Sequence, residues 1–175
     1  MRRTEQTAPW RVVGRGALAG LAGTAAMTLL QAKVASRLPS GTPRRPPREP
    51  QEPEAKDENI TETTARRMVE GFAHRHLPGW LRPTAGYAVH FATGAAWGAL
   101  LAMFAPRPRW WMGLAFGAAV WVIDDDLLGP LLKLADWPDH YPLGTHAKAL
   151  GAHVAYGLGT TLALTGSAAL SERTD

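Results

Sequence analysis

The chain has 175 residues, of which 46% are hydrophobic, and its formal net charge is +4 at pH 7. This length supplies one domain, with no room for a separate soluble catalytic domain. The absence of cysteine excludes disulfides, thiolate catalysis and Cys-ligated metals. No zinc-finger, helix-turn-helix or RNA-binding signature accompanies the basic charge, so nucleic acid is not expected as a partner.

The mean hydropathy of −0.14 is low for a membrane protein because it averages two kinds of segment. Residues 31–85 hold more than half of the 19 Lys and Arg residues, whereas most of the remainder is Ala, Gly, Leu, Val and Trp. A helix needs about 20 mostly apolar residues to cross a bilayer. Four segments approach this length: residues 12–31, 86–105, 110–132 and 146–170.

Amphipathic aromatic residues, which favour the headgroup zone, stand where these segments begin, as at Trp10, Trp80, Trp110 and Trp137. We therefore predict an all-α polytopic membrane protein, a bundle of four transmembrane helices with both termini on one side. A soluble helical protein is the alternative, but these segments are apolar around most of their circumference. A cleaved signal peptide is a second alternative, although residues 31–37 offer no small-x-small cleavage site.

Between the first two segments, residues 38–85 form a long polar insertion. Residues 38–58 are rich in Pro and charge, which predicts an extended, solvated linker. Ile60, Thr64, Met68 and Phe72 then recur at helical spacing, which predicts a short amphipathic helix on the membrane surface. Lys and Arg are more numerous on this side of the bundle, so the positive-inside rule favours the long loop in the cytoplasm, and the opposite orientation stays open.

Every predicted span carries a small-xxx-small pattern, which lets helix backbones approach closely in lipid. The patterns are Gly16-xxx-Gly20, Gly94-xxx-Gly98, Gly113-xxx-Gly117, and Gly151 with Ala155 and Gly159. They predict a tightly packed bundle and offer a surface for a homo-oligomer. In addition, His90-Phe-Ala-Thr-Gly94 aligns with His153-Val-Ala-Tyr-Gly157. This match suggests two helical hairpins related by a pseudo-twofold axis.

Ionisable side chains inside a span are costly and normally face the bundle interior. Successive spans run in opposite directions. The ionisable groups near the start of the second and fourth spans and near the end of the third therefore lie in the half of the membrane on the long-loop side. The candidate site residues are His90, Asp124, Asp125, His146 and His153. Three roles stay open for them: hydrogen bonding between helices, a proton or ion site, and haem or metal ligation by the histidines of the second and fourth spans. An enzyme is not expected, because no nucleophile–base pair, phosphate loop or HExxH motif is present.

The runs HFATGAAWGALLAMFAP, WWMGLAFGAAVWVIDDDLLGPLL and YPLGTHAKALGAHVAYG resemble the YagU-type family of small bacterial inner-membrane proteins. The resemblance covers about residues 86–160, with a weaker match at GALAGLAGTAAMTLLQ. It implies an inner-membrane location and a link to acid-stress tolerance, and it carries over no catalytic residue. The expected function is therefore a non-enzymatic integral inner-membrane protein that supports envelope or acid-stress tolerance, without a cofactor. The alternative is a proton- or ion-conducting, or haem-binding, helix bundle.

Overall fold

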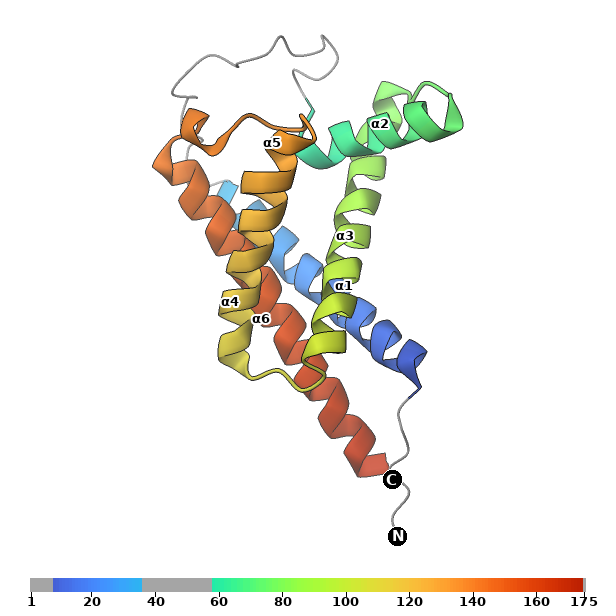
Figure 1. Cartoon of the computed structure of the whole chain (residues 1–175), viewed down its shortest axis with the longest axis vertical. Coiled ribbons are helices and arrows are strands. Elements are labelled where there is room, and N and C mark those ends of the chain that lie inside the picture. The colour runs from blue at the N-terminus through green and yellow to red at the C-terminus, as the bar shows by residue number, and fades with distance from the viewer. Residues whose placement is uncertain (1–7, 36–57, 175) are drawn as a thin grey trace.

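The computed structural model describes residues 8–35 and 58–174, except for the side chains of residues 34–35 and 168–174. Within these ranges every element is a helix and none is a strand, which confirms the all-α prediction. The long helices are α1 (Pro9–Ala35), α3 (Arg82–Phe104), α4 (Trp110–Trp121) and α6 (Leu143–Thr174). The start of α1 and the end of α6 lie at the same end of the molecule (Figure 1).

Four further elements gather at the opposite end (Figure 1). They are α2 (Ile60–Ala73), η2 (Gly79–Leu81), α5 (Gly129–Leu131) and η4 (Pro138–His140). α2 is the helix expected after the linker, and a capping box starts it. The Asn59 side chain accepts hydrogen bonds from the N–H groups of Thr61 and Glu62, while the Glu62 carboxylate accepts one from the Asn59 N–H. Residues 38–57 of the predicted linker lie outside the described residues.

Buried ion pairs attach α2 to the rest of the fold. The Glu58 side chain, only 4% exposed, lies between two guanidinium groups: Arg66 Nε is 3.1 Å from its Oε2 and Arg82 Nη1 is 3.0 Å from its Oε1. Because Arg82 is the first residue of α3, these pairs fix α2 against the start of that helix. Met68 and Phe72 are exposed, as expected for a helix on a membrane surface. α2 is therefore a packed part of the fold as well as a connector.

The third predicted span is one helical stretch that changes pitch. α4 continues into a wide π-helical turn, η3 (Val122–Leu128), and the stretch ends with α5 at Leu131. Pro130 accounts for the wide turn, because its ring would collide with the carbonyl of Asp126 in a regular α-helix. Hydrogen bonds of the i→i+5 type, such as that from the Gly129 N–H to the Asp124 carbonyl, avoid this collision.

Glycines bring α1 and α3 into backbone contact. A Cβ atom at Gly98 would lie 2.5 Å from the carbonyl oxygen of Gly16 and 2.5 Å from the Cα of Gly20. A Cβ atom at Gly20 would in turn overlap the carbonyl oxygen of Gly94. The two small-xxx-small patterns therefore meet face to face in an antiparallel pair, as predicted for helices that pack without side chains between them.

α4 and α6 form a second antiparallel pair of the same kind. A Cβ atom at Gly113 would lie 2.7 Å from the carbonyl oxygen of Gly157, and one at Gly117 would overlap the carbonyl oxygen of His153. The glycine pattern therefore predicts the packing of both pairs.

α1 also packs on α6, where a Cβ atom at Gly159 would lie 3.1 Å from the Cα of Gly23. The prediction was wrong for Gly151, which is exposed and has open space around it. Six residues separate Gly151 from Gly157, which rotates it by about 120° around the helix and away from the contact face.

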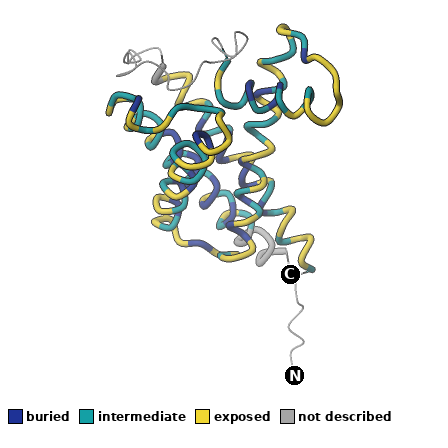
Figure 2. Tube along the Cα trace, turned by 45° about the horizontal axis from the view of Figure 1, so that its top comes forward, coloured by how far each residue is buried: buried dark blue, intermediate teal, exposed yellow. Residues whose placement is uncertain are grey.

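Polar side chains are buried in the bundle beside apolar ones, and many large apolar side chains are exposed on its outside. Thr24 and Thr160 are buried, and each hydroxyl donates a 2.8 Å hydrogen bond to a carbonyl one turn earlier in its own helix. Exposed residues run along the outer sides of the helices (Figure 2). The large exposed side chains include Trp10, Leu18, Leu29, Tyr87, Met103, Phe104, Trp110 and Leu162. Two helical segments of the described chain, Pro9–Lys33 and Gly79–Phe104, are long and apolar enough to cross a membrane.

Candidate functional site

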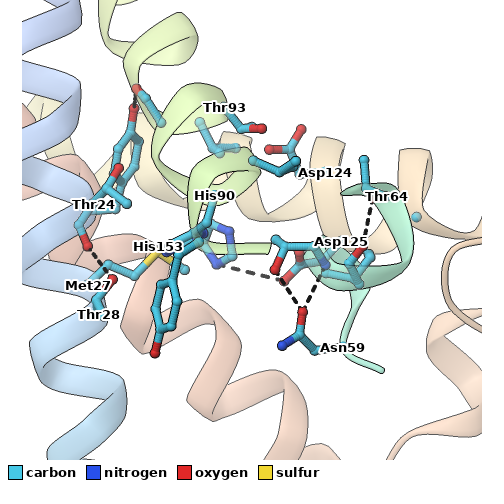
Figure 3. A pocket seen from close by; sticks show the side chains of 18 of the residues that line it. Thr24, Met27, Thr28, Asn59, Thr64, His90, Thr93, Asp124, Asp125 and His153 are labelled. Carbon is cyan, nitrogen blue, oxygen red and sulfur yellow. Dashed lines mark hydrogen bonds and ion pairs between the residues drawn. The ribbon is translucent and has the colours of Figure 1, made fainter. Parts of the chain in front are cut away.

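A cavity of about 810 Å³ lies among α1, α2, α3, η3 and α6, in the half of the bundle where the short elements gather. Four of the five predicted site residues line it: His90, Asp124, Asp125 and His153. Figure 3 shows these four side chains together with Asn59 and Thr64 from the start of α2. The fold thus brings residues of three separate helical segments, α3, η3 and α6, to the wall of one cavity.

The π-helical turn directs adjacent carboxylates to different helices. Asp124 Oδ2 accepts a 2.9 Å hydrogen bond from Nε1 of Trp97 on α3. Asp125 Oδ2 lies 3.8 Å from Nδ1 of His153 on α6. π-helical turns are frequent at functional sites because they reposition side chains in this way. Here the turn places two carboxylates on the wall of the same cavity.

His153 has two oxygen neighbours at Nδ1. The carbonyl oxygen of Ala149 is 2.9 Å away, so in the neutral ring with a hydrogen at Nδ1 this nitrogen donates along its own helix. The 3.8 Å separation from Asp125 is too long for a hydrogen bond, and this contact becomes an ion pair when the imidazole is protonated. His153 is therefore positioned to stabilise Asp125 in one protonation state more than in the other.

His90 reaches the cavity from α3. Its Nε2 atom is buried and has no hydrogen-bond partner among the described residues. His153, Asp124 and Asp125 line the same cavity as His90. The four ionisable groups therefore form one cluster, and a buried nitrogen without a partner among the described residues is the group in it that most needs a proton, a water or a ligand.

His146 does not line the cavity. Its Nε2 lies 3.0 Å from the carbonyl oxygen of Pro138, and its Nδ1 lies 3.9 Å from Asp126 Oδ1. His146 shares a helix face with His153, but seven residues at 1.5 Å each place it about 10 Å closer to the start of α6. It therefore contacts the loop between α5 and α6, and the predicted cluster of five divides into a cavity group of four and this separate contact.

Three features of the cavity were missing from the sequence prediction. Trp97 holds Asp124, and Tyr156 joins α6 to α3 through a 2.7 Å hydrogen bond from its hydroxyl to the carbonyl oxygen of Gly94. The first turn of α2 also lines the cavity. Helical spacing points to the two aromatic residues, because Trp97 follows His90 by seven residues and Tyr156 follows His153 by three. The position of α2 depends on long-range ion pairs and has no such local signal.

In the described ranges, no group of three or more His, Asp or Glu side chains is placed to hold a metal ion. Haem ligation by His90 and His153 stays a prediction. No family model, curated protein or solved structure matches the chain. The resemblance to the YagU-type family therefore also stays a prediction.

Proposed function

We propose that this chain is a non-enzymatic, four-span protein of the bacterial inner membrane that binds protons in a cavity reached from the long-loop side. The observation that carries the proposal is the cluster of two carboxylates and two imidazoles around one cavity, with His90 Nε2 buried and without a partner among residues 8–35 and 58–174. Carboxylates and imidazoles are the groups that take up and release protons inside membrane proteins.

The outer surface of the bundle supports the membrane assignment. In the two apolar windows of α1 and of Gly79–Phe104, only 33% and 22% of the residues are buried. A core helix of a soluble protein would be mostly buried, whereas a helix in lipid exposes apolar side chains. Residues 110–131 extend about 30 Å and the 32 residues of α6 about 48 Å, and each length suffices for a third and a fourth crossing.

The glycine contacts support a bundle of two related hairpins. Gly94 packs on Gly20 in the first hairpin, and Gly157 packs on Gly117 in the second. These are the same glycines that align when the second predicted span is superposed on the fourth and the first on the third. A duplicated hairpin would produce both the sequence match and the repeated contact.

The closed half of the bundle favours binding from one side over conduction. Between the cavity and the end that holds the start of α1, the backbones of α1 and α3 touch at Gly16 and Gly98, and those of α4 and α6 touch at Gly113 and Gly157. An ion path needs polar groups along its whole length. The ionisable side chains of the cluster lie only on the cavity side of these contacts.

Proton binding follows from the geometry of the Asp125–His153 contact. With a neutral imidazole, the Nδ1 hydrogen goes to the Ala149 carbonyl, and Asp125 receives no hydrogen bond from His153. Uptake of a proton by the imidazole gives Asp125 a counter-ion at 3.8 Å. A membrane site that changes charge with pH is also a chemical basis for the acid-stress tolerance that the YagU-type resemblance implies, and this link belongs to the proposal.

Infrared difference spectroscopy of the detergent-solubilised protein between pH 8 and pH 5 tests the proposal. We expect a shift of the carboxylate bands that is absent in Asp125→Asn and in His153→Gln, because protonation of the imidazole gives the Asp125 carboxylate a counter-ion. Asp139→Asn is the matched control, since Asp139 is exposed and does not line the cavity. A spectrum that all three variants leave unchanged would show that the cavity takes up no proton.

Proteoliposomes that contain a pH-sensitive dye in the lumen distinguish binding from conduction. We expect proton leakage equal to that of empty liposomes, because backbone contacts close the second half of the bundle. Leakage above that level, lost in Asp124→Asn, would replace the one-sided site with a conducting one.

A further inference from the structure

The cavity differs in charge from the chain that forms it. Its lining residues include three carboxylates, Glu62, Asp124 and Asp125, and neither Lys nor Arg is among them. The whole chain, by contrast, has more basic than acidic residues. Glu62 accepts a hydrogen bond from the Asn59 N–H, and Asp124 and Asp125 are the carboxylates that line the cavity together with His90 and His153. Carboxylates in a low-dielectric cavity without Lys or Arg attract cations and exclude anions.

The walls of the cavity are apolar and aromatic between these carboxylates. Trp97 and Tyr156 stand beside the charged cluster, and both rings contact Phe116, at centroid distances of 6.4 and 5.8 Å. Aromatic faces attract organic cations, and an apolar wall binds the hydrocarbon part of a ligand. Further apolar residues on the wall are Met27, Val89, Val120, Leu128, Leu132 and Leu134.

Size and ligand geometry argue against a bare metal ion. A volume of about 810 Å³ falls in the range that holds small organic molecules. No three His, Asp or Glu side chains of the described residues converge as metal ligands. The buried Nε2 of His90 has no partner in the described part of the chain and is positioned to hydrogen-bond with a ligand or a water that accompanies it.

We propose that the cavity binds an amphiphilic organic ammonium cation, with the charged nitrogen near Asp124 and Asp125 and the hydrocarbon part against the aromatic and aliphatic wall. This inference rests on the proposed function, because the proton is bound beside the same carboxylates. A bound ammonium group and a bound proton neutralise the same charge, so each weakens the binding of the other. The first turn of α2 lines one side of the cavity through Asn59, Thr61 and Thr64.

Equilibrium binding of radiolabelled phenyltrimethylammonium to the full chain in detergent tests this inference. We expect saturable binding that unlabelled phenyltrimethylammonium displaces. Its uncharged isostere tert-butylbenzene, which has a carbon in place of the nitrogen, should not displace it. The double variant Asp124→Asn/Asp125→Asn should bind about tenfold more weakly or worse, because it lacks the counter-charge. Asp139→Asn should bind like the wild type.

A second arm uses the wild-type protein alone, so that a folding defect in a variant does not decide the outcome. Binding should weaken about tenfold between pH 8 and pH 5, as protonation of the imidazole supplies Asp125 with a competing counter-ion. Equal displacement by tert-butylbenzene, or binding that neither pH nor the double variant changes, would overturn the ammonium site. Absence of binding with an intact infrared band would overturn the ligand and leave proton binding in place, whereas loss of both signals would overturn both proposals.

Discussion

Gly98 offers the sharpest test of how the helices are held together. In Gly98→Ala the new Cβ atom would lie 2.5 Å from both the Gly16 carbonyl oxygen and the Gly20 Cα. Ordinary contacts of a Cβ atom begin near 3.4 Å, so α1 and α3 would have to separate by about 0.9 Å. Both obstructing atoms belong to the backbone, which has no rotamer through which it can move away.

The expected magnitude follows from two opposing effects. Overpacking a close contact costs about 1–3 kcal/mol. The change from glycine to alanine in a helix favours the folded state by about 1 kcal/mol. Gly14 lies in the same pair of helices but has open space around it, so Gly14→Ala carries the second effect without the first. The difference between the two variants therefore isolates the packing cost, at about 1–3 kcal/mol.

Reversible unfolding in mixed micelles with an increasing fraction of dodecyl sulfate, followed by circular dichroism, measures this difference. Gly98→Ala should unfold at a lower fraction than the wild type, and Gly14→Ala at an equal or higher one. Gly151→Ala is a second control in α6, because Gly151 also faces open space. Equal stability of Gly98→Ala and Gly14→Ala would show that a Cβ atom at Gly98 does not disturb the contact between α1 and α3.

Three further predictions concern topology, α2 and the cavity. Single cysteines at Arg107 and His76, which flank α3, should react with impermeant reagents from opposite sides of the membrane, and labelling from one side would mean that α3 does not cross. Glu58→Gln removes the carboxylate that two guanidinium groups share, so amide hydrogen exchange in α2 should become faster. Glu70→Gln, at a more exposed site, should have little effect on this exchange. Trp97→Phe removes the donor to a cavity carboxylate and should cost about 1–3 kcal/mol in the same unfolding assay; an unchanged stability would show that the bond contributes nothing.

The positions of the long helices could be predicted because long apolar segments are a local property of the sequence. An apolar run of about 20 residues is visible in the sequence itself. The predicted 110–132 ends one residue beyond α5 at Leu131, and the predicted 86–105 ends one residue beyond α3 at Phe104. The sequence also predicts that His90, Asp124 and His153 lie in one half of the bundle, because successive helices run in opposite directions.

The remaining features depend on contacts that leave no periodic pattern. A small residue in a helix does not reveal which face meets a neighbour, so Gly151 and Gly159 looked alike although only Gly159 packs. The attachment of α2 depends on Glu58, which lies within a Pro-rich charged segment and is buried only because Arg66 and Arg82 approach it from two helices. Such long-range ion pairs are specified by the tertiary structure and not by local sequence.

The glycine contacts and the polar cavity are two consequences of one arrangement. Four helices that touched along their whole length through small residues would leave no space for a ligand. In this bundle the glycine contacts of α1 and α3 end at Gly20 and Gly94, and one turn further toward the cavity stand the larger side chains of Thr24 and His90. Larger side chains hold the helices apart, and α1 and α3 diverge toward the end that α2 covers (Figure 1). The close contact therefore fixes the angle at which α1 and α3 diverge. An alanine at Gly98 would force the two helices apart near Gly20, so Gly98→Ala should change proton binding in the infrared assay as well as stability.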